Sequence, residues 1–337
     1  MGPGSSPAGA RYGMKIGREL LIVGAGGMLG TALAQVASQH GWIPRAYTEA
    51  ELDITDGTAL VDAVARFVAG STRVEASGAV VNAAAYTDVE KAEDEVERAY
   101  LVNERAAGRL AAVARDAGLA FLHVSTDFVF DGSKQDAYRE TDEPNPLNVY
   151  GRSKLAGEQA VLSSHPEATI VRTAWTFGPG GTNFPTKILE RAQALTGGGV
   201  AGAPGGRAAM TAAEPVGLPA AAPKLQVVSD EVGSPTYSVD LAAGLLALLS
   251  TGATGLFHLT GTGFCSRYEL ALETLRLAGY RIPGGLIVEP VPSGTFSTRA
   301  ERPFHAVLDC SKAAKLGVAL PGWQDGLARF LAGLRDG

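Results

Sequence analysis

The sequence has few cysteines, few histidines and few aromatic residues. Only 7% of its 337 residues are aromatic, and its two cysteines are Cys265 and Cys310. The two fit no CxxC spacing, so we interpret both as buried thiols in a reducing compartment, with a disulfide as the minor alternative. No metal site is expected, because no two of the five histidines are spaced to share a helix face. The histidines are His40, His123, His165, His258 and His305.

Long apolar runs and an excess of basic charge are also missing. No segment approaches the ~18 continuous apolar residues of a membrane span. Residues 1–18 are rich in Gly, Pro, Ser and Ala and lack the apolar run of a signal peptide, so we expect a disordered tail and a cytoplasmic protein. The net charge of -6 argues against nucleic-acid and anionic-membrane partners and leaves small anionic ligands open.

What the sequence does have is enough apolar material for one large or two modest domains, since 46% of its residues are hydrophobic. Near its start, an apolar run at 20–23 leads into glycines 24, 27 and 30 and then into a helical stretch at 31–36. Strand, glycine turn and helix in this order predict a pyrophosphate-binding unit, in which peptide N–H groups at the helix start face the phosphates. Glycine turns are also common connectors, so the cluster alone is weak evidence.

Further strands alternate with helices, which predicts a parallel, doubly wound sheet with ligands beyond the carboxyl ends of its strands. The next strands are expected at 42–47, 79–82 and 120–125. Asp56 is expected to cap a helix over 59–68. Asp53, which also follows the second strand, is either an adenine or ribose contact or only a turn residue.

Tyr150 and Lys154 are the strongest candidates for chemistry. Asn145 is expected to cap a helix with Pro146 in its first turn, and that helix would place Tyr150 and Lys154 on one face. An ammonium near a phenol lowers the phenol pKa from its usual ~10 and yields a proton donor. The alternative is a half-buried Tyr with a solvated Lys. Thr126, at the end of the fourth strand, could bond a carbonyl oxygen or only the following turn.

Taken together, these motifs resemble the extended short-chain dehydrogenase/reductases and, among them, the dTDP-4-dehydrorhamnose reductase family. The resemblance spans 19–330 and also includes Arg172–Trp175, Asp230–Thr236 and Arg299–Pro303. It implies a Rossmann-type α/β fold, a doubly wound parallel sheet with a smaller interleaved C-terminal substrate domain. It also implies reduction of the C4 ketone of dTDP-4-dehydro-L-rhamnose to dTDP-L-rhamnose, in nucleotide-sugar biosynthesis, with NADPH or NADH.

The resemblance assigns roles to individual residues. It implies a catalytic set of Thr126, Tyr150 and Lys154. The implied substrate contacts are Thr126, Asp127, Trp175 and Arg302, where the guanidinium of Arg302, like that of Arg299, suits a diphosphate but could equally form a rim salt bridge. The implied cofactor contacts are Gly24, Gly27, Met28, Leu29, Gly30, Asp53, Ile54, Ala84, Ala85, Tyr86, Val124, Tyr150 and Lys154. Two departures, Phe128 where relatives often carry Tyr and Tyr86 where they carry His, are expected to alter packing and not chemistry.

The domain organisation follows from the same reasoning. Residues 19–174 plus about 237–262 are expected to form the dinucleotide-binding domain, and about 175–236 plus 263–337 the substrate domain. Residues 196–223 are so rich in Gly, Ala and Pro that we expect a disordered insertion, with a lid as the minor alternative. The alternative functions are a 4,6-dehydratase or epimerase, a reductase of a different dTDP-4-keto-deoxysugar, and a non-catalytic NADP-binding regulatory subunit. Dehydratases generally need an acid pair after the Thr, and here Phe128 follows Asp127.

The sequence leaves the partners and the cofactor preference partly open. A nucleotide sugar is the expected ligand. The choice between NADH and NADPH is not made, because both Arg45 and Glu49 lie near the end of the second strand. A homodimer and a Mg²⁺ ion at an interface are left open, although no metal is predicted from the sequence.

Overall fold

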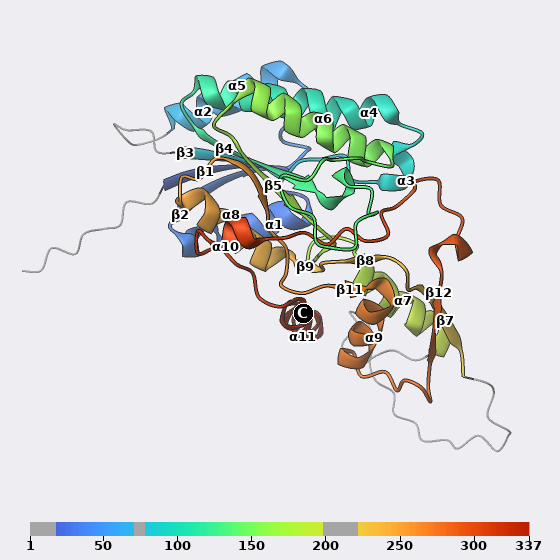
Figure 1. The fold of residues 1–337 in the computed structure, drawn as a ribbon. Helices are drawn as coiled ribbons and strands as arrows, with labels where there is room; N and C mark the ends of the chain where they lie inside the picture. Colours follow the sequence, from blue (N-terminus) through green and yellow to red (C-terminus); the bar gives the residue numbers. More distant parts are fainter. Residues whose placement is uncertain (1–17, 71–77, 198–221, 337) are drawn as a thin grey trace, which may run out of the picture.

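The structure is a computed structural model, which describes residues 18–70, 78–197 and 222–336. Its centre is a sheet of six parallel strands in the order β10-β5-β4-β3-β1-β2 (Figure 1). The order runs outward in both directions from β1 and β3, which makes the sheet doubly wound and confirms the predicted fold class. The strands are β1 (Arg18–Val23), β2 (Trp42–Tyr47), β3 (Gly78–Asn82), β4 (Ala120–Thr126), β5 (Thr169–Thr173) and β10 (Gly255–His258).

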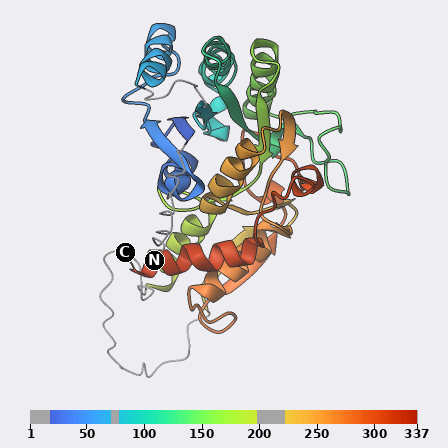
Figure 2. The same ribbon diagram turned by 90° about the vertical axis from the view of Figure 1, so that its left-hand side faces the viewer.

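Helices cover both faces of this sheet, and each face has its own apolar core (Figure 2). The inner strands β1, β3, β4 and β5 are mostly buried. In β1, for example, Leu20 and Ile22 pack into one core and Leu21 and Val23 into the other. Such continuous burial is expected of parallel strands between two helix layers. The helices on one face are α1 (Met28–Val36) and α8 (Ser238–Ser250), and those on the other are α2 (Gly57–Ala69), α5 (Ala107–Asp116) and α6 (Val149–Ser164).

Two parts of the sheet region differ from the expected pattern. Strand β5 was not predicted, because Thr169, Arg172 and Thr173 make it polar in sequence, yet every residue in it is buried. Between β3 and β4 the residue pattern from 89 to 117 is that of one long helix, but the chain forms α3 (Val89–Ala92), α4 (Val96–Tyr100) and a π-helical turn, η2 (Leu101–Ala106), before α5. The break follows α3, where the carbonyl of Lys91 accepts from both Asp94 N and Glu95 N.

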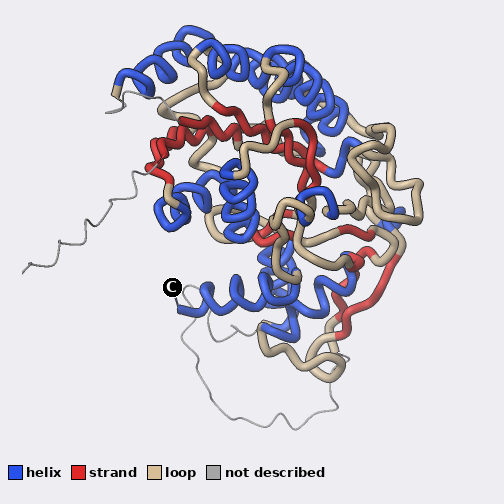
Figure 3. The backbone as a smooth tube through the Cα atoms, turned by 60° about the vertical axis from the view of Figure 1, so that its left-hand side comes forward, coloured by secondary structure: helices blue, strands red, loops and turns tan. Residues whose placement is uncertain are grey.

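The remaining segments form a smaller lobe beyond the carboxyl ends of the strands (Figure 3). Its sheets are pairs of short strands: β7 with β12 and β6 with β9, both parallel, and β8 with β11, antiparallel. Their bounds are β6 (Thr176–Phe177), β7 (Lys224–Val228), β8 (Val232–Gly233), β9 (Thr236–Tyr237), β11 (Cys265–Ser266) and β12 (Ile287–Val291). The helices of the lobe are α7 (Phe184–Thr196), α9 (Arg267–Leu277) and α11 (Trp323–Asp336). Helix α10 (Ser311–Ala314) instead packs against β10, on the face of the main sheet that carries α1 and α8.

The sequence pattern predicts the end of α7, strand β7 and helices α9 and α11 to within two residues, but it predicts neither the two-residue strands β6, β8, β9 and β11 nor β12. That strand lies in a passage predicted to be a Pro- and Gly-rich loop, and it tolerates Pro290 because it pairs with β7 alone and has a free edge. Both cysteines are free, but the prediction that both are buried is wrong for Cys310, which is partly exposed. Residues 1–17 and 198–221, which carry most of the predicted tail and insertion, lie outside the described residues. No helix in the described ranges could cross a membrane.

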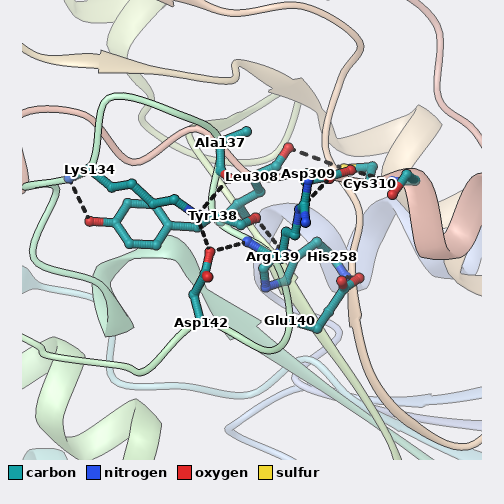
Figure 4. A network of polar contacts seen from close by, with 11 residues as sticks. Lys134, Ala137, Tyr138, Arg139, Glu140, Asp142, His258, Leu308, Asp309 and Cys310 are labelled. Carbon is teal, nitrogen blue, oxygen red and sulfur yellow. Dashed lines mark hydrogen bonds and ion pairs between the residues drawn. The ribbon is translucent and has the colours of Figure 1, made fainter.

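A polar network joins the sheet region to the C-terminal segment (Figure 4). Within it, His258 Nδ1 lies 3.1 Å from the carbonyl oxygen of Tyr138, and Glu140 accepts from the backbone N–H of His258. Tyr138 N in turn donates to Val307 O. A cavity of about 420 Å³ lies beside the network, and none of the predicted catalytic residues lines it. Its lining residues are Lys134, Asp136, Ala137, Arg139 and Asp309.

Candidate active site

The glycine turn has the shape that a phosphate-binding loop needs. Gly24 has a φ of +88°, which favours glycine, and a Cβ there would lie only 2.5 Å from Ala84 N. A Cβ on Gly30 would overlap with the carbonyl oxygen of Gly24. Gly27, the exposed N-cap of α1, offers no side chain to the N–H groups that follow at Met28 and Leu29. The start of α1 can therefore accept an anionic group.

Two more of the predicted cofactor segments lie at the ends of β2 and β3. Asp53 is exposed and accepts from the backbone N–H and hydroxyl of Thr55, which together lower the pKa of its carboxyl. Its neighbour Ile54 is buried in the core beneath. The observed contacts of Asp53 are those of the turn interpretation, and Asp56 caps α2 as predicted.

After β3, the segment Ala84–Tyr86 is partly buried and is held by Asn103. Asn103 Oδ1 accepts from Tyr86 N (2.8 Å), and its Nδ2 donates to Tyr86 O and to Ser153 Oγ. Asn103 lies in η2, and π-helical turns are frequent at functional sites. One buried amide thus ties the end of β3 to α6. Tyr86 packs with its hydroxyl donating to Glu95, consistent with a change in packing at this position.

Helix α6 begins later than predicted. Its N-cap is Asn148, whose Oδ1 accepts from Gly151 N at 2.8 Å, and not Asn145. Asn145 instead donates its side-chain amide to Asp131 and its backbone N–H to Val129. The prediction was wrong because Asn145 and Asn148 are equally good caps by residue type, and only the tertiary contacts of Asn145 separate them. Tyr150 and Lys154 nevertheless lie one turn apart on α6.

Tyr150 is half-buried, and its ring packs edge-on against Phe128 with 5.5 Å between the ring centres. Burial raises the pKa of its phenol to about 12, and Asp127 adds to this rise, while a hydrogen bond with Thr126 opposes it. The phenol is therefore protonated at neutral pH. Thr126 itself accepts from Phe128 N and donates to Asp127 Oδ1, so it also bonds the following turn.

Contrary to the prediction, Lys154 does not lower the pKa of Tyr150. Its amine is turned toward β4, where Nζ donates to Val124 O at 2.6 Å and lies 3.3 Å from His123 Nε2. Burial lowers the pKa of Lys154 to about 8, partly offset by Glu158. The shared helix face predicted that the two side chains lie near each other. It could not predict that a strand carbonyl would accept a hydrogen bond from the lysine amine.

Asp127 is a buried carboxylic acid beside Thr126. Burial raises its pKa to about 7, and Arg267 is among the groups that oppose the rise. Within the described residues, Asp127 Oδ2 is buried without a hydrogen-bond partner. An unpaired buried oxygen next to a catalytic candidate is a feature expected of a ligand-binding site.

Trp175 lies two residues after the end of β5, at the carboxyl edge of the sheet. It is a non-glycine residue with φ of +45°, an uncommon conformation that clusters at functional sites. The guanidinium of Arg267 stacks on its indole ring at 3.5 Å from the ring centre, and Arg267 Nε lies 3.6 Å from Glu231. A Cβ on Gly233 would overlap with the same indole. Arg267 was not predicted, because a capping box at Ser266 and Glu269 reveals a helix start but not a distant stacking partner.

Arg302 and Arg299 lie at the rim of this site and are engaged in ion pairs. Arg302 Nη2 lies 2.7 Å from Glu90 Oε1, and Arg299 pairs with Asp94. These are the rim salt bridges expected from the sequence as the alternative to diphosphate binding by the two arginines. Within the described residues, however, Arg302 Nε is buried without a partner, and it stays a candidate substrate contact. No group of His, Cys, Asp and Glu in the described ranges could hold a metal ion.

Comparison with known proteins identifies the family of this chain. Residues 18–197 and 215–335 match the family described as RmlD substrate binding domain. The dTDP-4-dehydrorhamnose reductase of Mycolicibacterium smegmatis is 37% identical, over 99% of this chain and 92% of that protein. The chain belongs to the dTDP-4-dehydrorhamnose reductase family. The resemblance given by its motifs is thereby confirmed.

Two further relatives bear on the cofactor and the sugar of this dTDP-4-dehydrorhamnose reductase family member. The crystal structure of the dTDP-4-dehydrorhamnose reductase of Bacillus anthracis in complex with NADP is 29% identical, with a TM-score of 0.79 over 94% of this chain and 99% of that one. The dTDP-4-keto-6-deoxy-D-glucose reductase of Streptomyces niveus is 38% identical, over 86% of this chain and 87% of that protein. The family therefore includes reductases named for different keto sugars.

The residues present fit a nicotinamide dinucleotide. In the turn between β1 and α1, a Cβ at Gly24 would overlap with the backbone of Ala84 and a Cβ at Gly30 with the carbonyl of Gly24, so this close-packed turn requires glycine at both positions. The small residues Ala84 and Ala85 leave the end of β3 flat beside this turn. Thr126 ends β4, which pairs with β3, and β3 pairs with β1. Helix α6 brings Lys154 to Val124 of β4 and Tyr150 to Phe128, two residues after Thr126.

Proposed function

We propose that this chain reduces the C4 ketone of dTDP-4-dehydro-L-rhamnose to dTDP-L-rhamnose, with NADPH or NADH as the reductant. The observation that carries the proposal is the set of Thr126, Tyr150 and Lys154 at the carboxyl edge of the sheet, in a member of the dTDP-4-dehydrorhamnose reductase family. This edge is where doubly wound sheets bind ligands.

When bound, the dinucleotide supplies the hydride. Tyr150 donates the proton to the carbonyl oxygen of the substrate, and its raised pKa keeps the phenol protonated at neutral pH. Thr126 donates a hydrogen bond to the same oxygen as negative charge develops on it. Lys154, in its ammonium form, binds the nicotinamide ribose.

The remaining predicted residues bind and orient the two ligands. Gly24 to Gly30, Asp53, Ile54, the segment 84–86 and Val124 contact the dinucleotide. Asp127, Trp175 and Arg302 contact the nucleotide sugar. On this basis residues 19–174 plus about 237–262 form the dinucleotide-binding domain, and about 175–236 plus 263–337 the substrate domain.

Two further parts of the proposal concern the setting of the reaction. The two free thiols, Cys265 and Cys310, are consistent with a reducing compartment, and we assign the enzyme to the cytoplasm. We also propose that it works as a homodimer, which sedimentation of the purified protein would test.

Tyr150→Phe is the sharpest test of this function. The substitution removes the hydroxyl but keeps the ring against Phe128, so we expect dinucleotide affinity to stay nearly unchanged. Turnover should fall by ~100-fold or more, the scale of a lost general acid. Turnover is followed by oxidation of the reduced dinucleotide, with identification of the product by mass and NMR. Tyr100→Phe, on helix α4, is a matched control and should leave both quantities unchanged.

A second candidate is the reduction of a different dTDP-4-keto-deoxysugar, which the Streptomyces niveus relative favours. The two candidates share the roles of Tyr150, Thr126 and Lys154 and differ only in the sugar. Turnover on a panel of dTDP-4-keto sugars separates them, because the specificity constant should be highest for the natural sugar. Wild-type protein that binds the dinucleotide but oxidises it with none of the sugars would instead support a non-catalytic regulatory subunit.

A further inference from the structure

A buried chain of hydrogen bonds runs from the end of β3 through β4 to Lys154. Asn82 and His123 have no exposed surface, and Lys154 is only 2% exposed. Asn82 Nδ2 lies 3.1 Å from His123 Nδ1, and His123 Nε2 lies 3.3 Å from Lys154 Nζ. None of the roles assigned above uses His123. We therefore consider what a fully buried imidazole in contact with a candidate catalytic amine does for that amine.

The direction of this chain is fixed at its first member. Asn82 Oδ1 accepts from the backbone N–H of Ala84 at 3.1 Å, so the amide cannot be turned around without placing two donors face to face. The Nδ2 group is therefore the part that faces His123, and His123 Nδ1 must accept. An imidazole that accepts at Nδ1 is neutral and carries its proton on Nε2. Burial agrees with this assignment, because it lowers the pKa of His123 well below the usual value.

The Nε2–H of His123 consequently points at Lys154 Nζ. An ammonium has three donors and no acceptor, whereas a neutral amine has a lone pair that can accept. Lys154 Nζ also donates to Val124 O at 2.6 Å, which suits either form. The contact with His123 is the one that distinguishes the two forms, and it favours the neutral amine.

The other ionisable groups near Lys154 do not reverse this preference. Glu158, one turn further along α6, favours the ammonium, but its two oxygens are bonded to Arg172 and one of them also to Ser125. Tyr150, one turn before Lys154, is an uncharged phenol at neutral pH. His123 on β4 is thus the nearest group that acts on the amine from outside its own helix.

We propose that His123 is a positioning residue for Lys154: oriented by Asn82, its Nε2–H holds the lysine amine against β4 and disfavours the ammonium. The effect on the reaction rests on the proposed function, in which Lys154 acts as an ammonium. Activity should then be present below the pKa of Lys154 and be lost as the pH rises through it. His123 sets where on the pH scale this loss occurs.

His123→Leu tests the effect on the pH profile of kcat/KM. Loss of the Nε2–H removes one hydrogen bond that stabilises the neutral amine, so the alkaline limb should move to higher pH by about half to one unit. His123→Gln keeps an N–H donor, and its limb should stay near that of the wild type. A role in folding alone would lower kcat/KM at all pH values without moving the limb. An unmoved limb in His123→Leu, or an equal displacement in both variants, would overturn the proposal.

A second measurement needs neither a variant of His123 nor any substrate. In the ligand-free wild-type protein labelled with ¹⁵N at histidine, long-range ¹H–¹⁵N correlation spectra show which ring nitrogen carries the proton. The expected result is a neutral His123 protonated at Nε2 throughout the neutral range, and a proton on Nδ1 would refute the proposal. In protein labelled with ¹³C at lysine Cε, with Lys154→Met used for assignment, Lys154 should titrate near pH 8 and not above 10. Because no turnover is measured, failure of the proposed function would leave these results intact.

Discussion

The sheet region and the smaller lobe of this protein are built in different ways. The sheet region repeats one unit, a buried apolar strand followed by a helix, and neighbouring strands are mostly close in sequence. The lobe is assembled from pairs of two-residue and five-residue strands that come from distant parts of the chain, such as β7 with β12. Local sequence patterns therefore specify the first region, whereas contacts across long sequence separations specify the second.

The candidate site lies where the two regions meet, and each contributes a different kind of residue. Thr126, Tyr150 and Lys154 come from the sheet region and carry the proposed chemistry. Arg267 and Gly233 come from the lobe and fix the indole of Trp175. If this division is correct, changes in the sheet region should affect stability, cofactor binding and turnover, and changes in the lobe should affect mainly the nucleotide sugar.

The largest expected difference between the regions concerns two Arg–Glu pairs of the same geometry. Arg172 and Glu158 form a bidentate pair in the sheet region, with exposed fractions of 2% and 5%. Arg276 and Glu273 form the same pair on α9 of the lobe, with exposed fractions of 66% and 23%. Removing one partner of a buried pair leaves an uncompensated charge and costs ~3–5 kcal/mol, whereas an exposed pair contributes ~1 kcal/mol or less.

Glu158→Gln should therefore lower the free energy of unfolding by about 3–5 kcal/mol, and Glu273→Gln by about 1 kcal/mol or less. Urea denaturation followed by circular dichroism measures both, and the two substitutions remove the same charge. Equal losses would show that burial of the Arg172–Glu158 pair does not increase its contribution to stability.

The sequence predicted the sheet region better than the lobe, because local sequence patterns specify the first and contacts across long sequence separations specify the second. β1, β3 and β4 were predicted to within two residues, because their mainly apolar runs end at Gly24, Asn82 and Ser125 and can be recognised from the local sequence. β5 was missed because its Arg172 is buried only by virtue of Glu158 on another element. β12 was missed because Pro290 argues against a strand unless the free edge of β12 is known.

The same limit applies to the candidate site. Helical spacing predicted that Tyr150 and Lys154 lie near each other. The contacts of the lysine amine with Val124 and His123 depend on how α6 packs on β4, which the sequence does not show. Arg267 was missed altogether, since its stacking on Trp175 joins two segments that have no shared sequence pattern.

Two glycine substitutions compare the ligand sites of the regions, with effects of intermediate size. Gly30→Ala would push a Cβ into the carbonyl of Gly24, a backbone group that cannot move aside, and overpacking of this kind costs roughly 1–3 kcal/mol. We expect dinucleotide affinity to fall about tenfold or more. Gly233→Ala would displace the indole of Trp175 and raise KM for the nucleotide sugar several-fold while leaving dinucleotide affinity unchanged.

Fluorescence titration with the reduced dinucleotide and steady-state kinetics measure the two effects separately. Gly294→Ala is the control, because a Cβ at Gly294 would meet no atom within 4 Å. If Gly233→Ala weakened dinucleotide binding as much as Gly30→Ala does, the assignment of the lobe to the sugar would be wrong.

The smallest expected effect concerns a side chain that bonds both regions. Asn148 caps α6 through Gly151 N, and its Nδ2 donates to Glu301 O at 2.7 Å in the segment that follows β12. Asn148→Ala removes both bonds and should lower the free energy of unfolding by about 1–2 kcal/mol. Asn145→Ala, at the residue that the sequence pattern favoured as the cap, should cost less than about 1 kcal/mol, since its side chain makes a single, solvent-exposed hydrogen bond to Asp131. Thermal denaturation of the two variants compares their losses of stability. A larger loss for Asn145→Ala would indicate that Asn145, and not Asn148, caps α6, as the sequence pattern predicted. In that case the capping side chain would not also bond the lobe, because only Asn148 bonds Glu301 O.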